Sequence, residues 1–89
     1  SPLHLIDVRE PGDYDIARIP GALLIPLSEL PVRLTDLDAT NAYVITCHRG
    51  GRSRRAGALL RAAGFEQVRI LDGGVDAWAA RIDLSMPRY

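Results

Sequence analysis

The stretch that decides the fold is Ala42–Ser53, AYVITCHRGGRS. Its first part, Tyr43–Thr46, is a run of apolar and β-branched residues that predicts a buried strand. The strand ends at Cys47, the only cysteine in the sequence, and a loop rich in Arg and Gly follows. A helical pattern begins at Ser53. A strand, a tight loop and a helix N-terminus in this order suit an anion, because the first N–H groups of a helix have no partner within it.

Outward from this stretch, apolar runs alternate with helical patterns. Strands are predicted at 3–8, 22–25, 42–46 and 67–71. Helices are predicted at 11–16, at 53–63 and at 75–82, and a further helix is predicted to begin after Ser28, which would be its N-cap. Gly64 is predicted to end the helix at 53–63. Residues 83–89 are expected to be irregular. In the helix at 53–63, one side carries Ala56, Leu59, Leu60 and Ala63.

Near-continuous apolar strands separated by helices predict an α/β fold with a parallel sheet covered on both faces. Four strands are few for such a sheet, and a missing N-terminal strand would complete it. The 89 residues are enough for one small domain. Because the first strand begins at Leu3 with no lead-in, we interpret residues 1–89 as a single domain cut from a longer chain.

Composition excludes several function classes. Eleven basic and eleven acidic residues balance, whereas a nucleic-acid binder shows a basic excess. No apolar run is long enough to span a membrane, and no signal peptide is recognisable. One cysteine cannot form an internal disulfide and offers no thiolate-rich metal site, so we expect no metal or cofactor and a reducing compartment, the cytoplasm.

Cys47 is the candidate nucleophile. In open parallel sheets, sites lie beyond the C-terminal ends of the strands, where Cys47 is placed and where Arg9 follows another strand. Backbone N–H groups from His48 to Ser53 can point at the sulfur, and Gly50 and Gly51 permit the backbone angles that such a cradle needs. The cradle would stabilise the thiolate, the reactive form of cysteine. A thiol open to reagents is expected.

Five blocks of the sequence, in order, resemble the rhodanese family of sulfurtransferases. They cover most of the chain: Leu5–Pro11, Ile19–Ala22, Cys47–Ser53, Gly64-Phe65, and Leu71–Gly74 with Ala77-Trp78. Where many members have Gly-His before the second block, this chain has Ala17-Arg18. The resemblance implies a three-layer fold and a sulfane sulfur carried as a persulfide on Cys47. Thiosulfate in vitro, or a cysteine desulfurase, is the implied donor, and a thiol or sulfur-carrier protein the implied acceptor.

A second resemblance concerns a subgroup. Tyr14-Asp15-Ile16, Arg81-Ile82-Asp83 after Trp78, and the end Met86–Tyr89 are similar to rhodanese domains fused behind an adenylyltransferase. That subgroup activates ubiquitin-like sulfur carriers, which implies an upstream adenylyltransferase domain. The pathway served, whether molybdopterin, thiamine or thiolated tRNA synthesis, stays open.

The charged residues around Cys47 receive separate roles. Arg49 and Arg52 are expected to meet an anionic donor or an acidic partner. Arg54 and Arg55 fall in the first turn of the helix predicted at 53–63. For Arg55 the simpler interpretation is that its side chain lies on the solvent-exposed face of that helix. The resemblance implies that Asp7 and Arg9 are a supporting pair, interpreted as a structural ion pair that orients loops. His48 is interpreted as a rim residue.

Two other functions remain open. A cysteine phosphatase or arsenate reductase on the same fold would need Cys-(five residues)-Arg. Counting from Cys47, that position holds Ser53, with Arg52 and Arg54 on either side, so the loop is one residue short. The alternative from another class is a non-catalytic rhodanese-like module that binds proteins. Such relatives typically lack the cysteine, which this chain retains.

Overall fold

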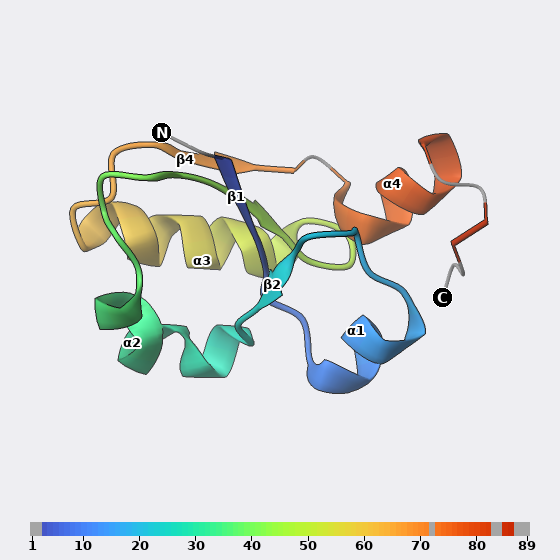
Figure 1. The fold of residues 1–89 in the computed structure, drawn as a ribbon, viewed down its shortest axis with the longest axis horizontal. Helices are drawn as coiled ribbons and strands as arrows, with labels where there is room; N and C mark the ends of the chain where they lie inside the picture. The colour runs from blue at the N-terminus through green and yellow to red at the C-terminus, as the bar shows by residue number, and fades with distance from the viewer. Residues whose placement is uncertain (1–2, 72, 83–84, 87–89) are drawn as a thin grey trace.

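A parallel sheet of four strands forms the centre of the protein (Figure 1). The computed structural model describes residues 3–71, 73–82 and 85–86. The strands are β1 (Leu3–Asp7), β2 (Leu23–Leu24), β3 (Ala42–Thr46) and β4 (Val68–Ile70), ordered β2-β1-β3-β4. Ile45 lies opposite Ile6 on one side and Ile70 on the other. The predicted parallel sheet is confirmed. Expectations for Asp72 and for residues 83–84 and 87–89 lie outside the described residues.

Within the described residues, four α-helices connect and cover the strands: α1 (Pro11–Ile16), α2 (Leu30–Arg33), α3 (Gly51–Ala62) and α4 (Gly74–Arg81). The prediction of Ser28 as an N-cap was wrong. Ser28 lies inside a 3₁₀ turn, Leu27–Glu29, whose N-cap is Pro26, and the N-cap of α2 is Glu29. Pro31 follows within α2, and it lacks the N–H that a helix continuous from Leu27 would need. The segment therefore breaks into short pieces.

α3 begins at Gly51, two residues before the predicted start at Ser53. The reason is Gly50, which has φ +124°, a left-handed angle that turns the chain at once into the helix. The buried side of α3 also differs from the prediction. Ala56 and Leu60 are buried as expected, but Leu59 is 37% exposed and Ala63 is exposed, while Ser53 and Gly57 are buried.

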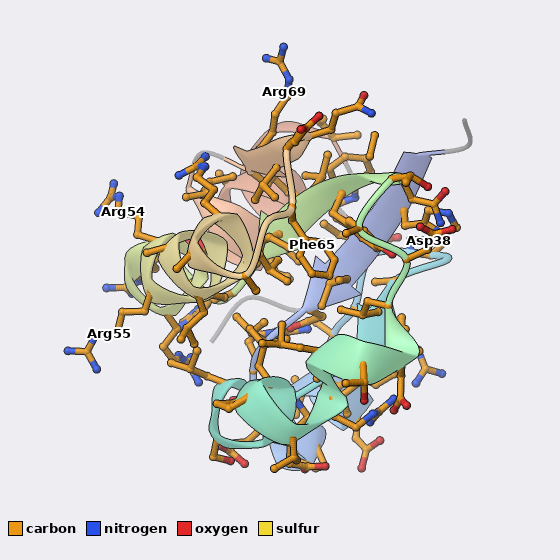
Figure 2. The ribbon with its side chains drawn as sticks, turned by 90° about the vertical axis from the view of Figure 1, so that its left-hand side faces the viewer. Asp38, Arg54, Arg55, Phe65 and Arg69 are labelled. Carbon is orange, nitrogen blue, oxygen red and sulfur yellow. The ribbon has the colours of Figure 1, made fainter. Side chains whose placement is uncertain are left out.

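The core lies on both faces of the sheet, which makes the fold three-layered. Alternate strand residues point to opposite faces, so Ile6 and Leu5 belong to different clusters. One cluster joins β1 and β3 to α2 and α3 through Ile6, Val8, Ile25, Leu30, Tyr43, Ile45, Ala56, Leu60, Phe65 and Val68. The other joins Leu5 to α4 through Ala17, Ile19, Leu71, Val75, Trp78 and Met86. Figure 2 shows Phe65 turned inward and Arg54, Arg55 and Arg69 turned outward.

The C-terminal ends of the central strands bring three loops together. Val8, just after β1, donates its N–H to the Thr46 carbonyl at 2.9 Å. Arg9 and Cys47 therefore follow their strands at the same end of the sheet. Beyond β4, Leu71 donates to the Ile45 carbonyl at 2.9 Å and leads to α4. None of the described helices is both long and apolar enough to cross a bilayer.

Candidate active site

The Cys47 sulfur lies inside the loop that begins α3. The Gly50 N–H donates to Sγ at 2.9 Å, and the Ser53 hydroxyl lies 3.6 Å from Sγ. The same hydroxyl donates to the Gly50 carbonyl at 2.8 Å, which ties the loop to the first turn of the helix. No side chain caps α3 at Gly50. The sulfur therefore occupies the place of an N-cap oxygen, facing N–H groups that have no helical partner.

The surroundings lower the pKa of the Cys47 thiol below its ordinary value. Burial is the largest single influence and raises the pKa, because it disfavours the charged thiolate. Hydrogen bonds to the thiolate oppose it: first from the Ser53 hydroxyl, which turns from the Gly50 carbonyl to the sulfur when the thiol ionises, and then from the backbone of Ser53, Gly50 and Arg49. Together these hydrogen bonds outweigh burial. The loop thus favours the nucleophilic form of the residue.

Access to the thiol is narrower than the sequence suggests. Cys47 is 1% exposed, whereas a thiol open to reagents was expected. The residue nevertheless lines an open pocket of about 460 Å³. Its other lining residues are His48, Arg49, Gly51, Arg52 and Arg55. Cys47 is therefore buried against this pocket, and the pocket is the side from which a small reagent would approach it.

The pocket is basic. Arg49 and Arg52, the arginines expected to meet an anionic donor, line it. Arg55 also lines it and is exposed, in agreement with a solvated face. Arg54 is exposed and is not among the lining residues. Arg52 Nη1 lies 3.8 Å from Asp13 Oδ2, which links the loop to α1. Several arginines along one pocket favour an anionic reagent.

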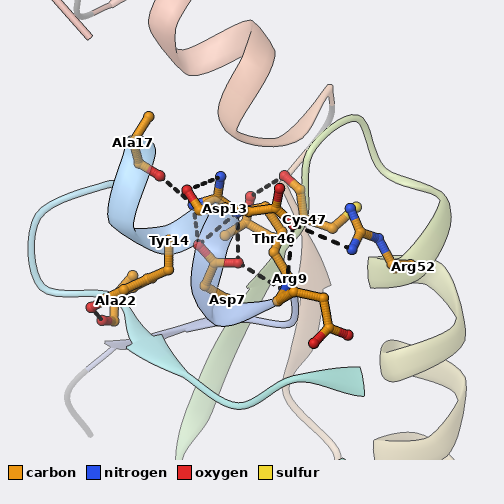
Figure 3. Close-up of polar contacts among 10 residues, drawn as sticks. Asp7, Arg9, Asp13, Tyr14, Ala17, Ala22, Thr46, Cys47 and Arg52 are labelled. Carbon is orange, nitrogen blue, oxygen red and sulfur yellow. Dashed lines mark hydrogen bonds and ion pairs between the residues drawn. The ribbon is translucent and has the colours of Figure 1, made fainter. Parts of the chain in front are cut away.

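Asp7 and Arg9 form a buried ion pair below the loop (Figure 3). Both side chains are fully buried, and Arg9 Nη2 lies 2.7 Å from Asp7 Oδ2. Arg9 Nε and backbone N–H also donate to Asp7 Oδ1, at 2.9 and 3.0 Å. The guanidinium continues to α1, donating to the carbonyls of Asp13 and Ala17. The pair expected from the sequence is present, and it holds α1 against the end of β1.

α4 makes a contact with the loop that the sequence analysis did not predict. The N–H groups of Val75 and Asp76 donate to the carbonyls of Cys47 and His48, at 2.8 and 3.0 Å. His48 Nε2 lies 4.0 Å from Asp76 Oδ1. The signal for this contact was the Gly73-Gly74 pair before a helix, which was used above only as part of the resemblance to the rhodanese family.

The residues near Cys47 do not form a metal centre. Among residues 3–71, 73–82 and 85–86, no group of three or more His, Cys, Asp or Glu side chains comes together as metal ligands would. A larger open groove, of about 620 Å³, runs along β4 between Arg61 and Arg69. Among the described residues, no cysteine, serine, threonine, lysine or histidine lines this groove. Cys47 therefore remains the candidate nucleophile.

Comparisons with known proteins identify the family of this chain. Residues 1–81 match the family described as Rhodanese-like domain. Over 89 residues the chain is 40% identical to the "Probable adenylyltransferase/sulfurtransferase MoeZ" of Mycobacterium tuberculosis, covering 98% of this chain and 23% of that protein. It is 37% identical over 75 residues to a "Sulfurtransferase" of Allochromatium vinosum, covering 84% and 70%. A solved structure, "rhodanese with anions from E. coli", superposes with a TM-score of 0.75 at 32% identity, covering 97% and 95%.

The chain belongs to the rhodanese-like family. Its relatives support sulfur transfer as the general class of activity. The chain spans only 20% to 44% of several longer curated relatives that it matches. Those relatives include adenylyltransferase and sulfurtransferase proteins, as the resemblance of the tail predicts.

Proposed function

We propose that the protein is a sulfurtransferase that carries sulfane sulfur as a persulfide on Cys47. The observation that carries the proposal is the Gly50 N–H donated to Sγ at 2.9 Å, at the start of α3 and against a basic pocket. This arrangement favours a thiolate before reaction and an anionic persulfide after it. Asp7 and Arg9 have a supporting role, because the pair holds α1 against the end of β1.

The first half-reaction uses thiosulfate as the donor in vitro. The Cys47 thiolate attacks the outer sulfur of thiosulfate, and a bond forms between Sγ and that sulfur. The original S–S bond breaks, and sulfite leaves with the bonding electron pair. Arg49, Arg52 and Arg55 line the approach, so they suit a dianionic donor and the departing sulfite. Gly50, Gly51 and Ser53 complete the loop around the sulfur.

The second half-reaction returns the enzyme to its starting state. A nucleophile, cyanide in vitro or an acceptor thiolate, attacks the terminal sulfur of the persulfide. The S–S bond of the persulfide breaks, and its electron pair goes back to Cys47 as the thiolate. No redox partner or metal enters either step.

For the physiological reaction we propose a cysteine desulfurase persulfide as donor and a sulfur-carrier protein as acceptor. The similarity to adenylyltransferase/sulfurtransferases supports this choice. An adenylyltransferase domain acting on the same carrier is then the expected companion. A reducing compartment such as the cytoplasm would keep Cys47 available.

Intact mass spectrometry tests the proposal directly. Incubation with thiosulfate is expected to add the mass of one sulfur atom, cyanide to remove it, and Cys47→Ser to abolish the gain. Turnover of an aryl phosphate without sulfur gain would instead identify a phosphatase. A protein with neither activity would be a binding module.

Two neighbouring arginines provide a matched pair for the pocket. Arg55 lines it and Arg54 does not, although both are exposed and both variants lose one charge. Arg55→Ala is expected to raise the KM for thiosulfate by up to about fivefold, the size of one exposed charge contact. Arg54→Ala is expected to change the KM less. Equal effects would mean that only net charge matters.

A further inference from the structure

The first turn of α4 packs against the outer side of the Cys47 loop. The N–H groups of Val75 and Asp76 belong to this turn, so they have no partner within α4. Each donates instead to a loop carbonyl, Val75 to Cys47 at 2.8 Å and Asp76 to His48 at 3.0 Å. Two consecutive peptide groups of the loop are thereby held by a helix from a distant part of the sequence.

Holding a carbonyl also holds the next N–H. In a planar trans peptide the C=O and the following N–H point in opposite directions, and the described residues include no cis peptide bond. The His48 carbonyl faces α4, so the Arg49 N–H faces away from α4, toward the inside of the loop. The Arg49 backbone is one of the hydrogen-bond donors that lower the pKa of Cys47.

This approach requires glycine at residue 74. Gly74 has φ +61°, and a Cβ there would lie 2.2 Å from the Cys47 carbonyl oxygen and 2.7 Å from that of His48. Both contacts are steric clashes with backbone atoms, which a change of side-chain rotamer cannot relieve. Any side chain at residue 74 would push α4 off the two carbonyls that it holds.

We propose that Gly74 is a positioning residue for Cys47: it lets the amide end of α4 hold the Cys47 and His48 carbonyls outward, so that loop N–H groups face the sulfur. The inference rests on Cys47 being the reactive thiol proposed above. α4 thereby contributes to the orientation of the loop N–H groups around the Cys47 sulfur, in addition to the N-terminus of α3. Gly74 acts through the loop backbone and touches no reagent.

The test is the pH profile of Cys47 alkylation by iodoacetamide, followed by intact mass. The chain has one cysteine, so a single site is counted, and sulfur transfer is not needed. Gly74→Ala is expected to shift the profile to higher pH, slowing alkylation about tenfold at neutral pH while the limiting rate at high pH is retained. The charged groups at the pocket, His48, Arg49, Arg52 and Arg55, are unchanged in this variant.

Gly64→Ala is the matched control. Gly64 also has a positive φ, +94°, but a Cβ there meets nothing within 4 Å. Gly64→Ala also places a side chain at a positive φ, but away from the loop, and its alkylation profile is expected to match the wild type. An equal shift in both variants would overturn the inference, since the shift would then reflect general destabilisation.

A second pair of variants decides the matter if Gly74→Ala does not fold. Asp76→Pro removes the N–H that holds the His48 carbonyl, in the first helical turn where proline is tolerated. Asp76→Ala removes the carboxylate and keeps the N–H. The inference predicts a shift only in Asp76→Pro. Equal shifts, or none, overturn it. A wild type that alkylates at low pH yet takes up no sulfur would remove the proposed function and leave this inference standing.

Discussion

Replacing Arg9 by methionine should destabilise the protein strongly. Asp7 and Arg9 are both fully buried, and the guanidinium supplies the Asp7 carboxylate with donors at 2.7 and 2.9 Å. Arg9→Met removes these donors. The buried Asp7 carboxylate then keeps the backbone N–H of residue 9 as a hydrogen-bond donor but loses its opposite charge. Breaking a buried pair from one side costs about 3–5 kcal/mol. The carbonyls of Asp13 and Ala17 lose a donor as well.

Urea unfolding, followed by circular dichroism, measures this loss as a lower midpoint at unchanged slope. A thermal scan should show Tm falling by at least about 12 °C, at about 4 °C for each kcal/mol in a domain of this size. The double variant Asp7→Leu/Arg9→Met should recover part of the loss, because no unpaired charge remains. Arg33→Ala is the control, since its pair with Asp36 is exposed and contributes at most about 1 kcal/mol. A loss below about 1 kcal/mol for Arg9→Met would refute the reasoning.

Two further predictions concern the core and the thiol. Leu60→Ala should lower the free energy of unfolding by about 2–5 kcal/mol, because Leu60 is fully buried. Leu59→Ala should lower it by less than about 1 kcal/mol, because Leu59 is 37% exposed. Similar losses for the two variants in urea unfolding would contradict the assignment of the buried face of α3. Folding lowers the pKa of Cys47, so the thiolate stabilises the folded protein. This stabilisation is fully present above the ordinary thiol pKa of about 8.5, and it is lost as the pH falls through the pKa of Cys47 in the folded protein. The stability of the wild type relative to Cys47→Ser should therefore rise from about pH 6 to about pH 9 in reducing buffer, and a flat or falling difference would contradict the hydrogen bonds described around Sγ.

Much of the fold could be predicted from local patterns. The apolar runs place both ends of all four strands within one residue of the observed ends, because buried parallel strands are continuous and apolar. Errors occur where one residue overrides a pattern. Gly50 turns the chain early and starts α3 at Gly51, and Pro31 breaks the helix expected from Ser28. Leu59 fitted the apolar stripe but lies at the exposed edge of α3.

The candidate site was predictable where its residues are adjacent in sequence. Cys47 and the loop to Ser53 are one continuous segment, so their proximity needs no knowledge of the fold. Contacts across the fold were not predictable. The N–H groups of Val75 and Asp76 on the loop carbonyls depend on where β4 delivers α4, and the low exposure of Cys47 depends on how the loop closes over the sulfur.

The central claim is that the loop holds Cys47 as a thiolate. The most direct measurement is the ultraviolet absorbance of the thiolate as the pH rises, with Cys47→Ser as the blank. The account predicts an ionisation midpoint below the value of about 8.5 for free cysteine. A midpoint at or above that value would mean that burial outweighs the hydrogen bonds from Ser53, Gly50 and Arg49, and would contradict the account.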